Sequence, residues 1–324
     1  MYNTVPPENY RFGWLSRTRN HLGYALRRQW FIYAMLLPSF ILLTMFVYYP
    51  AGEAMIMSLF DWKPGVRTIF IGLHNFKRVV EDPAFWISWR NVVLMGLWKF
   101  TIPFIVPLAM AEAIFNLRNR ASSSFYRVVL LIPALVPSIV SLMLWKWLYG
   151  SEGGINLMLD AIGLGELARP WLGTQETALA AVLFVGFPWV TGVDPLIYLA
   201  GLLNISEEMI DASQLDGCST WQRIWYVDLP HLSGQIRLLL MLGIINLLRR
   251  FGDVLALTEG GPGSATVVPG LYLYKKAFGI ERFEKMDVRL GEACAAGVII
   301  FTVIFILTFI SNRYGRKSGI EDYS

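Results

Sequence analysis

Charged residues are scarce in this 324-residue chain: only 16% are Asp, Glu, Lys or Arg, whereas 55% are hydrophobic. Soluble domains average about a quarter charged residues, and a soluble fold of this length needs a polar exterior. The shortage of charge therefore excludes an ordinary soluble enzyme, and the excess of apolar residues excludes a disordered chain. A mean hydropathy of +0.48 instead indicates an integral membrane protein with several spans.

Cysteine and histidine are also rare. The two cysteines, Cys218 and Cys294, lie far apart, and no Cys-x-x-Cys or Cys/His pattern is present. We therefore expect neither a disulfide nor a metal site. The histidines at positions 21, 74 and 231 are scattered and are not expected to be ligands or catalysts. No Gly-x-x-x-x-Gly-Lys-Ser/Thr phosphate loop occurs, so the chain is not expected to bind ATP itself.

The net charge is only +4, and the basic residues lie beside apolar segments instead of forming one stripe. This distribution favours contact with anionic membrane lipid and no binding of nucleic acid.

Six stretches are apolar enough to cross a bilayer as helices, which takes about 20 residues each. They are residues 30–49, 91–115, 125–149, 177–202, 236–257 and 289–311. The fifth is the weakest, because Arg249, Arg250 and Asp253 interrupt it. In lipid, the hydrogen bonds of the backbone must form within a helix or within a closed barrel. Barrel strands alternate apolar and polar residues, whereas these stretches are continuously apolar, which favours helices. The sequence thus predicts an all-α membrane protein built as a six-helix transmembrane bundle.

Polar tails flank the predicted transmembrane domain of residues 30–312. Residues 1–29 contain several arginines and no early signal-type stretch, which predicts a retained cytoplasmic tail. Residues 313–324 form a second basic tail. Six spans place both tails on one side, and the flanking Arg and Lys favour the cytoplasm. The expected outer loops, residues 50–90 and 258–288, also contain Lys and Arg, which makes this orientation signal less clean.

A cytoplasmic loop, residues 203–232, contains signals for two short helices. Ser206 is a good N-cap, and the acidic residues after it favour the positive end of a helix over 207–216. Gly217 can adopt the left-handed conformation that ends this helix. The alternative interpretation is an ordinary solvated loop.

The second short helix of this loop is expected to begin at Ser219, which with Gln222 forms a possible capping box. Pro230 is expected to close the unit. The loop is therefore predicted to be a helix–turn–helix that another protein could approach.

One run in this loop resembles the coupling-loop signature of ABC importer permeases. It consists of Asp211-Ala212-Ser213-Gln214-Leu215-Asp216-Gly217, then Ile224, then Leu229-Pro230. The family signature reads Glu-Ala-Ala, three residues, Gly, and then Ile and Leu-Pro at fixed distances. The chain departs from it at Asp211, which replaces Glu, and at Ser213, which replaces the second Ala.

A second run, Leu257-Thr258-Glu259-Gly260-Gly261-Pro262, is similar to the Leu-Thr-x-Gly-Gly-Pro element of sugar permeases of the maltose-permease type. The two motifs at their expected separation are more specific than either alone. The resemblance covers about residues 30–312, and the chain as a whole is also similar to permease subunits of alginate importers.

The resemblance implies a division of labour in a bacterial inner membrane. This chain would pair with a second related permease, two ATP-binding subunits that hold ATP and Mg²⁺, and a periplasmic or extracellular solute-binding protein. The chain itself would need no cofactor and would not be an enzyme. The residues expected to couple to the ATPase are Asp211, Ala212, Ser213, Leu215, Asp216 and Gly217.

Charged side chains at mid-membrane are costly and usually face an aqueous pathway or a partner, although long side chains near span ends can snorkel. The candidates for the substrate pathway are Lys99, Lys146, Trp189, Arg249, Arg250 and Asp253. Adjacent arginines face different directions, so we expect one to face the pathway and the other to pair with Asp253 or with the partner subunit. An arginine fork matches a carboxylate, which favours an acidic, uronate-type oligosaccharide over a neutral sugar. The resemblance to alginate importers implies that this sugar is of the alginate type.

The tryptophans near the spans have two interpretations. Trp98, Trp145, Trp147 and Trp189 could stack on sugar rings, but such residues more often form the interfacial aromatic belt.

Two other functions were weighed. An ion-coupled secondary transporter would use Asp194, Asp253 and Glu292 as proton or cation sites, but the coupling-loop signature argues against it. A membrane-embedded enzyme has no support, because the sequence shows no nucleophile–base or metal-ligand cluster.

Overall fold

The computed structural model describes residues 30–63, 65, 67–117, 119–189, 192–279 and 288–317. The chain forms two compact units, Met1–Ile56 and Met57–Ser324. The predicted cytoplasmic tail 1–29 and residues 318–324 of the C-terminal tail lie outside the described residues.

The first unit is built on one long apolar helix. Helix α2 (Trp30–Leu43), a π-helical turn (Thr44–Tyr48) and α3 (Tyr49–Met57) form a continuous stretch of 28 residues that is apolar enough to cross a membrane. None of the residues in α2 is buried within the protein. A helix that is apolar on all sides needs lipid or another protein around it. The predicted first span is therefore confirmed and extends to Met57.

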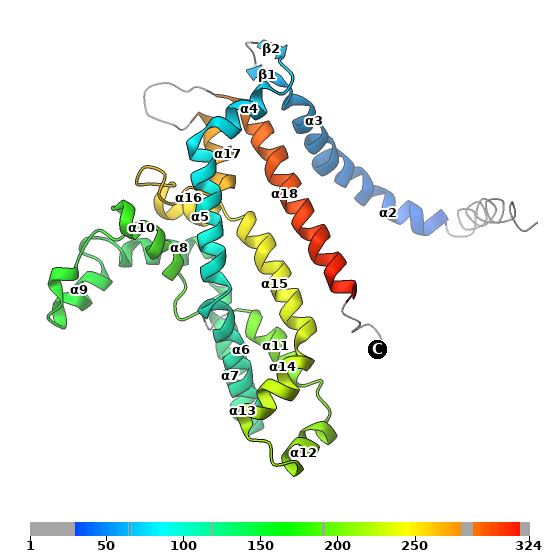
Figure 1. Cartoon of the computed structure of the whole chain (residues 1–324), viewed down its shortest axis with the longest axis vertical. Coiled ribbons are helices and arrows are strands. Elements are labelled where there is room, and N and C mark those ends of the chain that lie inside the picture. The colour runs from blue at the N-terminus through cyan, green and yellow to red at the C-terminus, as the bar shows by residue number, and fades with distance from the viewer. Residues whose placement is uncertain are drawn as a thin grey trace, which may run out of the picture. The chain divides into compact units, whose positions relative to one another are not determined.

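The second unit contains the remaining elements (Figure 1). They are strands β1 (Phe60–Lys63) and β2 (Arg67–Phe70) and helices α4 (His74–Glu81), α5 (Pro83–Lys99), α6 (Ile102–Phe115), α7 (Arg120–Leu131), α8 (Ser138–Leu148), α9 (Gly154–Ala161), α10 (Gln175–Phe184), α11 (Asp194–Leu202), α12 (Glu207–Leu215), α13 (Thr220–Arg223), α14 (Leu229–His231), α15 (Ser233–Leu248), α16 (Gly252–Thr258), α17 (Pro269–Phe278) and α18 (Leu290–Lys317). Short 3₁₀ or π turns occupy Ile132–Leu135, Gly165–Leu167 and Ile224–Asp228.

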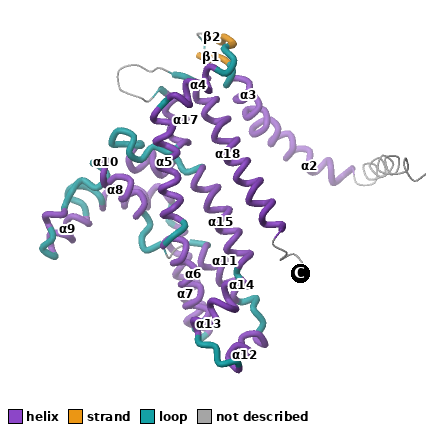
Figure 2. Tube along the Cα trace, in the orientation of Figure 1, coloured by secondary structure: helices purple, strands orange, loops and turns teal. Residues whose placement is uncertain are grey.

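Within this unit, α12 and α13 lie at one end, and the β-hairpin, α4 and α17 lie at the opposite end (Figures 1 and 2). The hairpin is antiparallel, with Phe60 opposite Phe70 and Lys63 opposite Arg67. Asn75 of α4 donates its side-chain amide to the carbonyl oxygens of Ser58 and Phe60, at 2.9 and 2.8 Å, and so fixes the start of the hairpin.

Three helices in the described residues are long and apolar enough to span a membrane: Trp30–Met57, Pro83–Phe115 and Leu290–Phe309. Two bent pairs bring the number to five. One pair, 121–135 with 138–148, bends by 82°, and the other, 220–231 with 233–248, bends by 67°. The predicted six-helix bundle is compatible with this arrangement.

The fourth and fifth predicted spans are not single helices. The stretch 177–202 divides into α10 and α11, because the backbone of Gly186 and Trp189 has positive φ (87° and 57°) and leaves the helical region. The stretch 236–257 divides where α15 ends at Leu248 and α16 begins at Gly252. The apolar run of the fourth stretch does not reveal its break, whereas Arg249, Arg250 and Asp253 mark the break in the fifth.

Two apolar clusters organise the second unit from its middle to the α12 end. The first packs α5, α8, α10, α16 and α17 around residues such as Met95, Val182 and Leu271. The second joins α6, α7, α11 and α15 and includes Ile210 and Val227 of the 203–232 loop. This second cluster connects the loop directly to the helices of the bundle.

A polar contact fastens α5 to α17. Asp82, the N-cap of α5, accepts hydrogen bonds from the Ala84 amide (2.9 Å) and the Tyr272 hydroxyl (2.9 Å), and pairs with Lys276 Nζ at 3.0 Å. Burial alone would raise the pKa of Asp82, but the hydrogen bonds from Lys276, Ala84 and Tyr272 outweigh it and lower the pKa. The Lys276 side chain is only 7% exposed, so its charge depends on this partner.

We expect D82N to lower the free energy of unfolding by about 3 kcal/mol at neutral pH, because it removes a carboxylate that pairs with a nearly buried ammonium. A depressed native pKa contributes stability above the carboxyl's ordinary value of 3.8, and this contribution disappears as the pH falls through the lowered native value. The gap between wild type and D82N in thermal unfolding should therefore close in acid. K77Q, which removes the exposed Lys77–Glu81 pair, is the control and should change little. A D82N protein as stable as K77Q at neutral pH would contradict this assignment.

Candidate functional site

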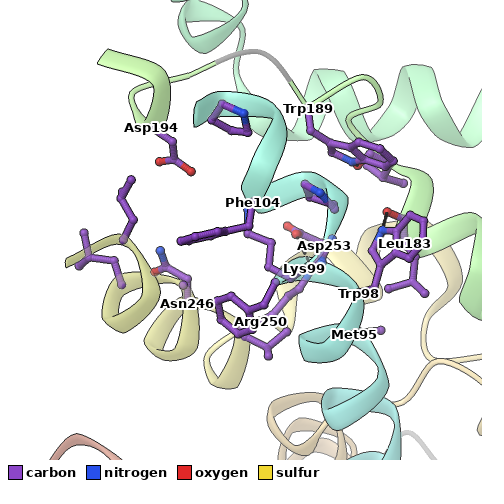
Figure 3. Close-up of a pocket in the computed structure, with 18 of the residues that line it drawn as sticks. Met95, Trp98, Lys99, Phe104, Leu183, Trp189, Asp194, Asn246, Arg250 and Asp253 are labelled. Carbon is purple, nitrogen blue, oxygen red and sulfur yellow. Dashed lines mark hydrogen bonds and ion pairs between the residues drawn. The ribbon is translucent and has the colours of Figure 1, made fainter. Parts of the chain in front are cut away.

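A cavity of about 640 Å³ lies between α5, α6, α11, α15, α16 and the segment that connects α10 to α11 (Figure 3). It collects five of the six residues that the sequence suggested for a substrate pathway. They are Lys99, Trp189, Arg249, Arg250 and Asp253. The sixth candidate, Lys146, does not line the cavity: its Nζ donates to the Ala256 carbonyl at 3.2 Å and links α8 to α16.

The break between α15 and α16 presents the two arginines to this cavity. Arg250 Nε donates to Asp253 Oδ2 at 2.9 Å, which confirms the expected ion pair. Arg249 is exposed and forms no side-chain hydrogen bond or ion pair within the described ranges, although both arginines line the cavity. The guanidinium of Arg249 is therefore available to a ligand.

Aromatic rings form one wall of the cavity. The rings of Trp98 and Trp189 lie 5.8 Å apart, and Phe184 packs against both, at 5.1 and 5.7 Å. The indole of Trp98 donates to the Leu183 carbonyl (3.1 Å), and that of Trp189 donates to the Val185 carbonyl (3.3 Å). These bonds hold the ring planes against the α10 end, on the wall away from Asp194 (Figure 3).

The four tryptophans considered in the sequence thus separate into two groups. Trp98 and Trp189 line the cavity, whereas Trp145 packs against the apolar core and Trp147 is 61% exposed. Only the first two have the placement that sugar stacking would require.

Several cavity residues were not suggested for a pathway by the sequence. They include Asn246, Phe104 and Tyr198. Asn246 could have been found, because it is a polar residue in an apolar run, three positions before Arg249 and hence on the same helix face. Phe104 and Tyr198 carry no such signal, because aromatic residues are equally common in a packed core.

The acidic residues considered for ion coupling do not meet. Asp194 and Asp253 line the main cavity, whereas Glu292 lies in a separate polar cavity of about 280 Å³. There it lies between Arg78 and Arg289, at 3.4 and 3.6 Å. The described residues contain no group of three His, Cys, Asp or Glu side chains suited to a metal ion.

The 203–232 loop forms the predicted helix–turn–helix. Helix α12 begins after Ser206, whose Oγ accepts the Met209 amide at 3.4 Å, and Gly217 has the predicted left-handed φ of +75°. The capping box is present, with Ser219 N–H bonded to Gln222 Oε1 at 2.8 Å and Gln222 N–H to Ser219 Oγ at 3.4 Å.

Pro230 does not close this unit, contrary to the prediction. It lies within α14, and the helical stretch from Thr220 continues to His231. In the π-helical turn Ile224–Asp228, the Leu229 amide donates to the Ile224 carbonyl. The helical stretch therefore continues through Pro230, although proline has no N–H to donate. The chain bends after His231 instead.

The six coupling candidates lie on two faces of this unit. Asp211, Ala212, Leu215, Asp216 and Gly217 are exposed. Leu215 is 88% exposed and presents its whole side chain at this end of the molecule. Ser213 is buried and donates its hydroxyl to the Ile210 carbonyl at 2.7 Å, so it faces the bundle.

A bundle of membrane-spanning helices around a polar cavity, with a capped helical loop at one end, defines the class of a membrane permease subunit. Residues 104–317 match the family described as "Binding-protein-dependent transport system inner membrane component", and the chain belongs to this family. It is therefore a multi-pass inner-membrane permease subunit of an ABC transporter and not itself an enzyme, as the sequence motifs indicated.

Relatives cover nearly the whole chain. The "Trehalose/maltose transport system permease protein MalF" of Thermococcus litoralis is 29% identical over 286 residues, which are 88% of this chain and 93% of the relative. The "Lactose transport system permease protein LacF" of Rhizobium radiobacter is 27% identical, over 86% and 92% of the two chains.

A solved structure has the same fold. It is a bacterial ABC transporter "involved in the import of the acidic polysaccharide alginate", with a TM-score of 0.79 and 22% identity over 92% of this chain and 99% of the other. This likeness confirms the predicted fold class.

The cavity can be tested by thiol labelling in a C218S/C294S background. N246C is expected to react about tenfold faster with a small charged reagent than L238C, because a thiol in a wet cavity ionises more readily than one against lipid. Both positions lie on α15 and both are exposed, but only Asn246 lines the cavity. Equal labelling rates in the two variants would refute an aqueous cavity on this face of α15.

Proposed function

We propose that this chain forms half of the pathway of an ATP-driven importer for acidic oligosaccharides of the uronate type. The observation that carries this proposal is the cavity, which places the unpaired guanidinium of Arg249 near an aromatic wall. Aromatic faces stack on the apolar faces of sugar rings, and a guanidinium binds a carboxylate through two parallel hydrogen bonds. One cavity therefore offers a partner to the rings of an acidic sugar and a partner to its carboxylates.

The charge balance of the cavity supports an anionic substrate. Three cations, Lys99, Arg249 and Arg250, line it with two acids, Asp194 and Asp253, which leaves a formal charge of +1 (3 − 2). Because Asp253 already pairs with Arg250, the available positive charge is on Arg249 and Lys99. The sugar-transport names of the relatives agree with a carbohydrate substrate, and alginate fits the acidic part of the proposal.

The exposed face of α12 supports coupling to separate ATPase subunits. We infer that Leu215 and Ala212 enter an apolar socket on the ATPase, that Asp211 anchors the contact, and that Gly217 fixes the angle between the two short helices. This arrangement requires residues 203–232 and both termini to be cytoplasmic. The complete importer would also contain a second permease and a solute-binding protein; a similar alginate transporter structure contains an "alginate pentasaccharide-bound periplasmic protein".

A panel of oligosaccharides tests the substrate. In the reconstituted complex, acidic oligosaccharides should stimulate ATP hydrolysis and neutral ones should not. R249Q should lower the apparent affinity for the acidic substrate by about 10- to 100-fold, since a hydrogen bond to a charged group contributes about 1.5–3 kcal/mol. K146Q changes a cation outside the cavity and should keep wild-type affinity. Stimulation by neutral oligosaccharides alone would reject the acidic substrate.

Residues 203–232, with their two short helices, are called the coupling unit below. Substitutions in the coupling unit test the link to the ATPase. G217V should uncouple hydrolysis from transport, because a β-branched residue in the left-handed region costs about 1–2 kcal/mol and changes the turn. D211N should weaken coupling without changing membrane insertion. The readout is sugar transported per ATP hydrolysed. Fully coupled transport in both variants, or sugar accumulation by this chain without any ATPase, would exclude the proposed role.

A further inference from the structure

A polar cluster with two buried carboxylates joins helix α6 to the second helix of the coupling unit. It consists of Glu112 and Asn116 on α6 and its C-cap, and of Arg223 and Asp228 in the 220–228 segment. We call these four residues the Arg223 cluster. Neither the coupling motif nor the cavity includes any of them.

Arg223 makes the connection. Its Nε donates to Asp228 Oδ2 at 3.1 Å, and its Nη2 donates to Asn116 Oδ1 at 2.6 Å. The guanidinium also lies over the Phe115 ring, 5.6 Å from its centre. The Arg223 side chain is 12% exposed and that of Asp228 is fully buried. A charged fork that is held from two elements fixes their relative angle, which apolar packing alone does not do.

The end of α6 is prepared for this contact. The side-chain amide of Asn116 donates to the Glu112 carbonyl at 2.7 Å, so its oxygen is directed to Arg223. The contact thus uses both halves of one amide side chain, one toward its own helix and one toward the coupling unit.

The two carboxylates of the cluster have different surroundings. Asp228 accepts the guanidinium's hydrogen bond through Oδ2, and its Oδ1 has no partner within the described ranges. Neither carboxylate oxygen of the 6% exposed Glu112 has a partner there. Glu112 is close enough to Asp228 and Arg223 for their charges to interact. Two buried charged carboxylates beside one guanidinium would be expensive. The functional charge is therefore that of Asp228, and Glu112 can be replaced by an amide of the same shape.

Helix α6 leads from this cluster to the cavity. Its first turns supply Pro103, Phe104 and Pro107 to the cavity wall, and Asn116 lies 12 residues beyond Phe104. At 1.5 Å per residue, the cluster acts about 18 Å from the wall along one helix. Displacement of the coupling unit thus has a direct route to the pathway.

We propose that Arg223, Asp228 and Asn116 are positioning residues that lock the coupling unit to α6 and so transmit ATPase-driven motion to the cavity. This inference rests on the proposed function, because it needs an ATPase that moves α12.

The test uses the complete reconstituted importer and compares R223Q, D228N, R223Q/D228N, N116A and E112Q. R223Q and D228N should each keep ATP hydrolysis and lower the sugar transported per ATP by about tenfold, since each leaves a buried charge without its partner. The double variant should stay as uncoupled as R223Q, because it also lacks the guanidinium that reaches Asn116. It should nevertheless be more stable than either single variant, since it removes both charges of the ion pair together. E112Q is the matched control within the same cluster and should behave as wild type.

N116A provides a milder variant, because Asn116 is exposed and its truncation should not prevent folding. We expect it to lower transport per ATP several-fold while the ATPase still copurifies. Wild-type coupling in N116A or in the double variant, or an E112Q defect equal to that of D228N, would each overturn the inference. Loss of ATPase copurification in R223Q would also overturn it, because the cluster would then act on docking.

G217V separates failure of this inference from failure of the proposed function. If G217V uncouples transport and R223Q does not, the coupling unit acts on the pathway without the Arg223 cluster. If neither variant changes coupling, the proposed function itself is wrong.

Discussion

The structure depends on one constraint: inside a membrane, a backbone that leaves the helix must have its polar groups satisfied by protein or by water in a cavity. The second unit leaves the helix at several places within apolar stretches, and two of these breaks lie between α10 and α11 and between α15 and α16. Residues from both breaks line the same cavity. The helix breaks, the two arginines and the aromatic wall therefore all belong to the cavity. A cavity in a membrane protein tolerates irregular backbone and charged side chains for the same reason, because both need polar partners or water.

An ion pair with a buried member lies at each end of the second unit. At the hairpin end, Asp82 ties α5 to α17 through Tyr272 and Lys276. At the α12 end, Arg223 ties the coupling unit to α6. The region between these ends is held by the apolar clusters and by single hydrogen bonds such as that from Lys146 to the Ala256 carbonyl. Ion pairs with buried partners are costly to break, whereas apolar surfaces can slide at smaller cost.

Local signals explain what the sequence predicted well. Ser206, Gly217 and the Ser219–Gln222 pair act on backbone groups within a few residues, so their roles could be assigned without the fold. The pairing of Arg250 with Asp253 was also local, at three positions along the chain. Hydropathy did not predict the break between α10 and α11, because Val185 and Phe187 are apolar, whereas Arg249, Arg250 and Asp253 marked the fifth stretch as interrupted. Lys146 was misplaced because its distance from the cavity depends on how α8 packs against α16, which no neighbouring residue encodes. The burial of Ser213 also depends on tertiary packing, because the bundle covers this side of α12. The three-residue spacing between Ser213 and Ile210, whose carbonyl accepts the Ser213 hydroxyl, was visible in the sequence.

Two glycines determine how closely α5 and α15 pack beside the cavity. A β-carbon on Gly96 of α5 would lie 2.8 Å from Leu247 of α15, and one on Gly243 of α15 would lie 2.9 Å from Phe100. These glycines let α5 and α15 approach closely beside the cavity, as small residues do between membrane helices. Each glycine receives a side chain of the facing segment, Leu247 over Gly96 and Phe100 over Gly243. Because Leu247 and Phe100 also line the cavity, a larger residue at either glycine would displace a side chain of the cavity wall.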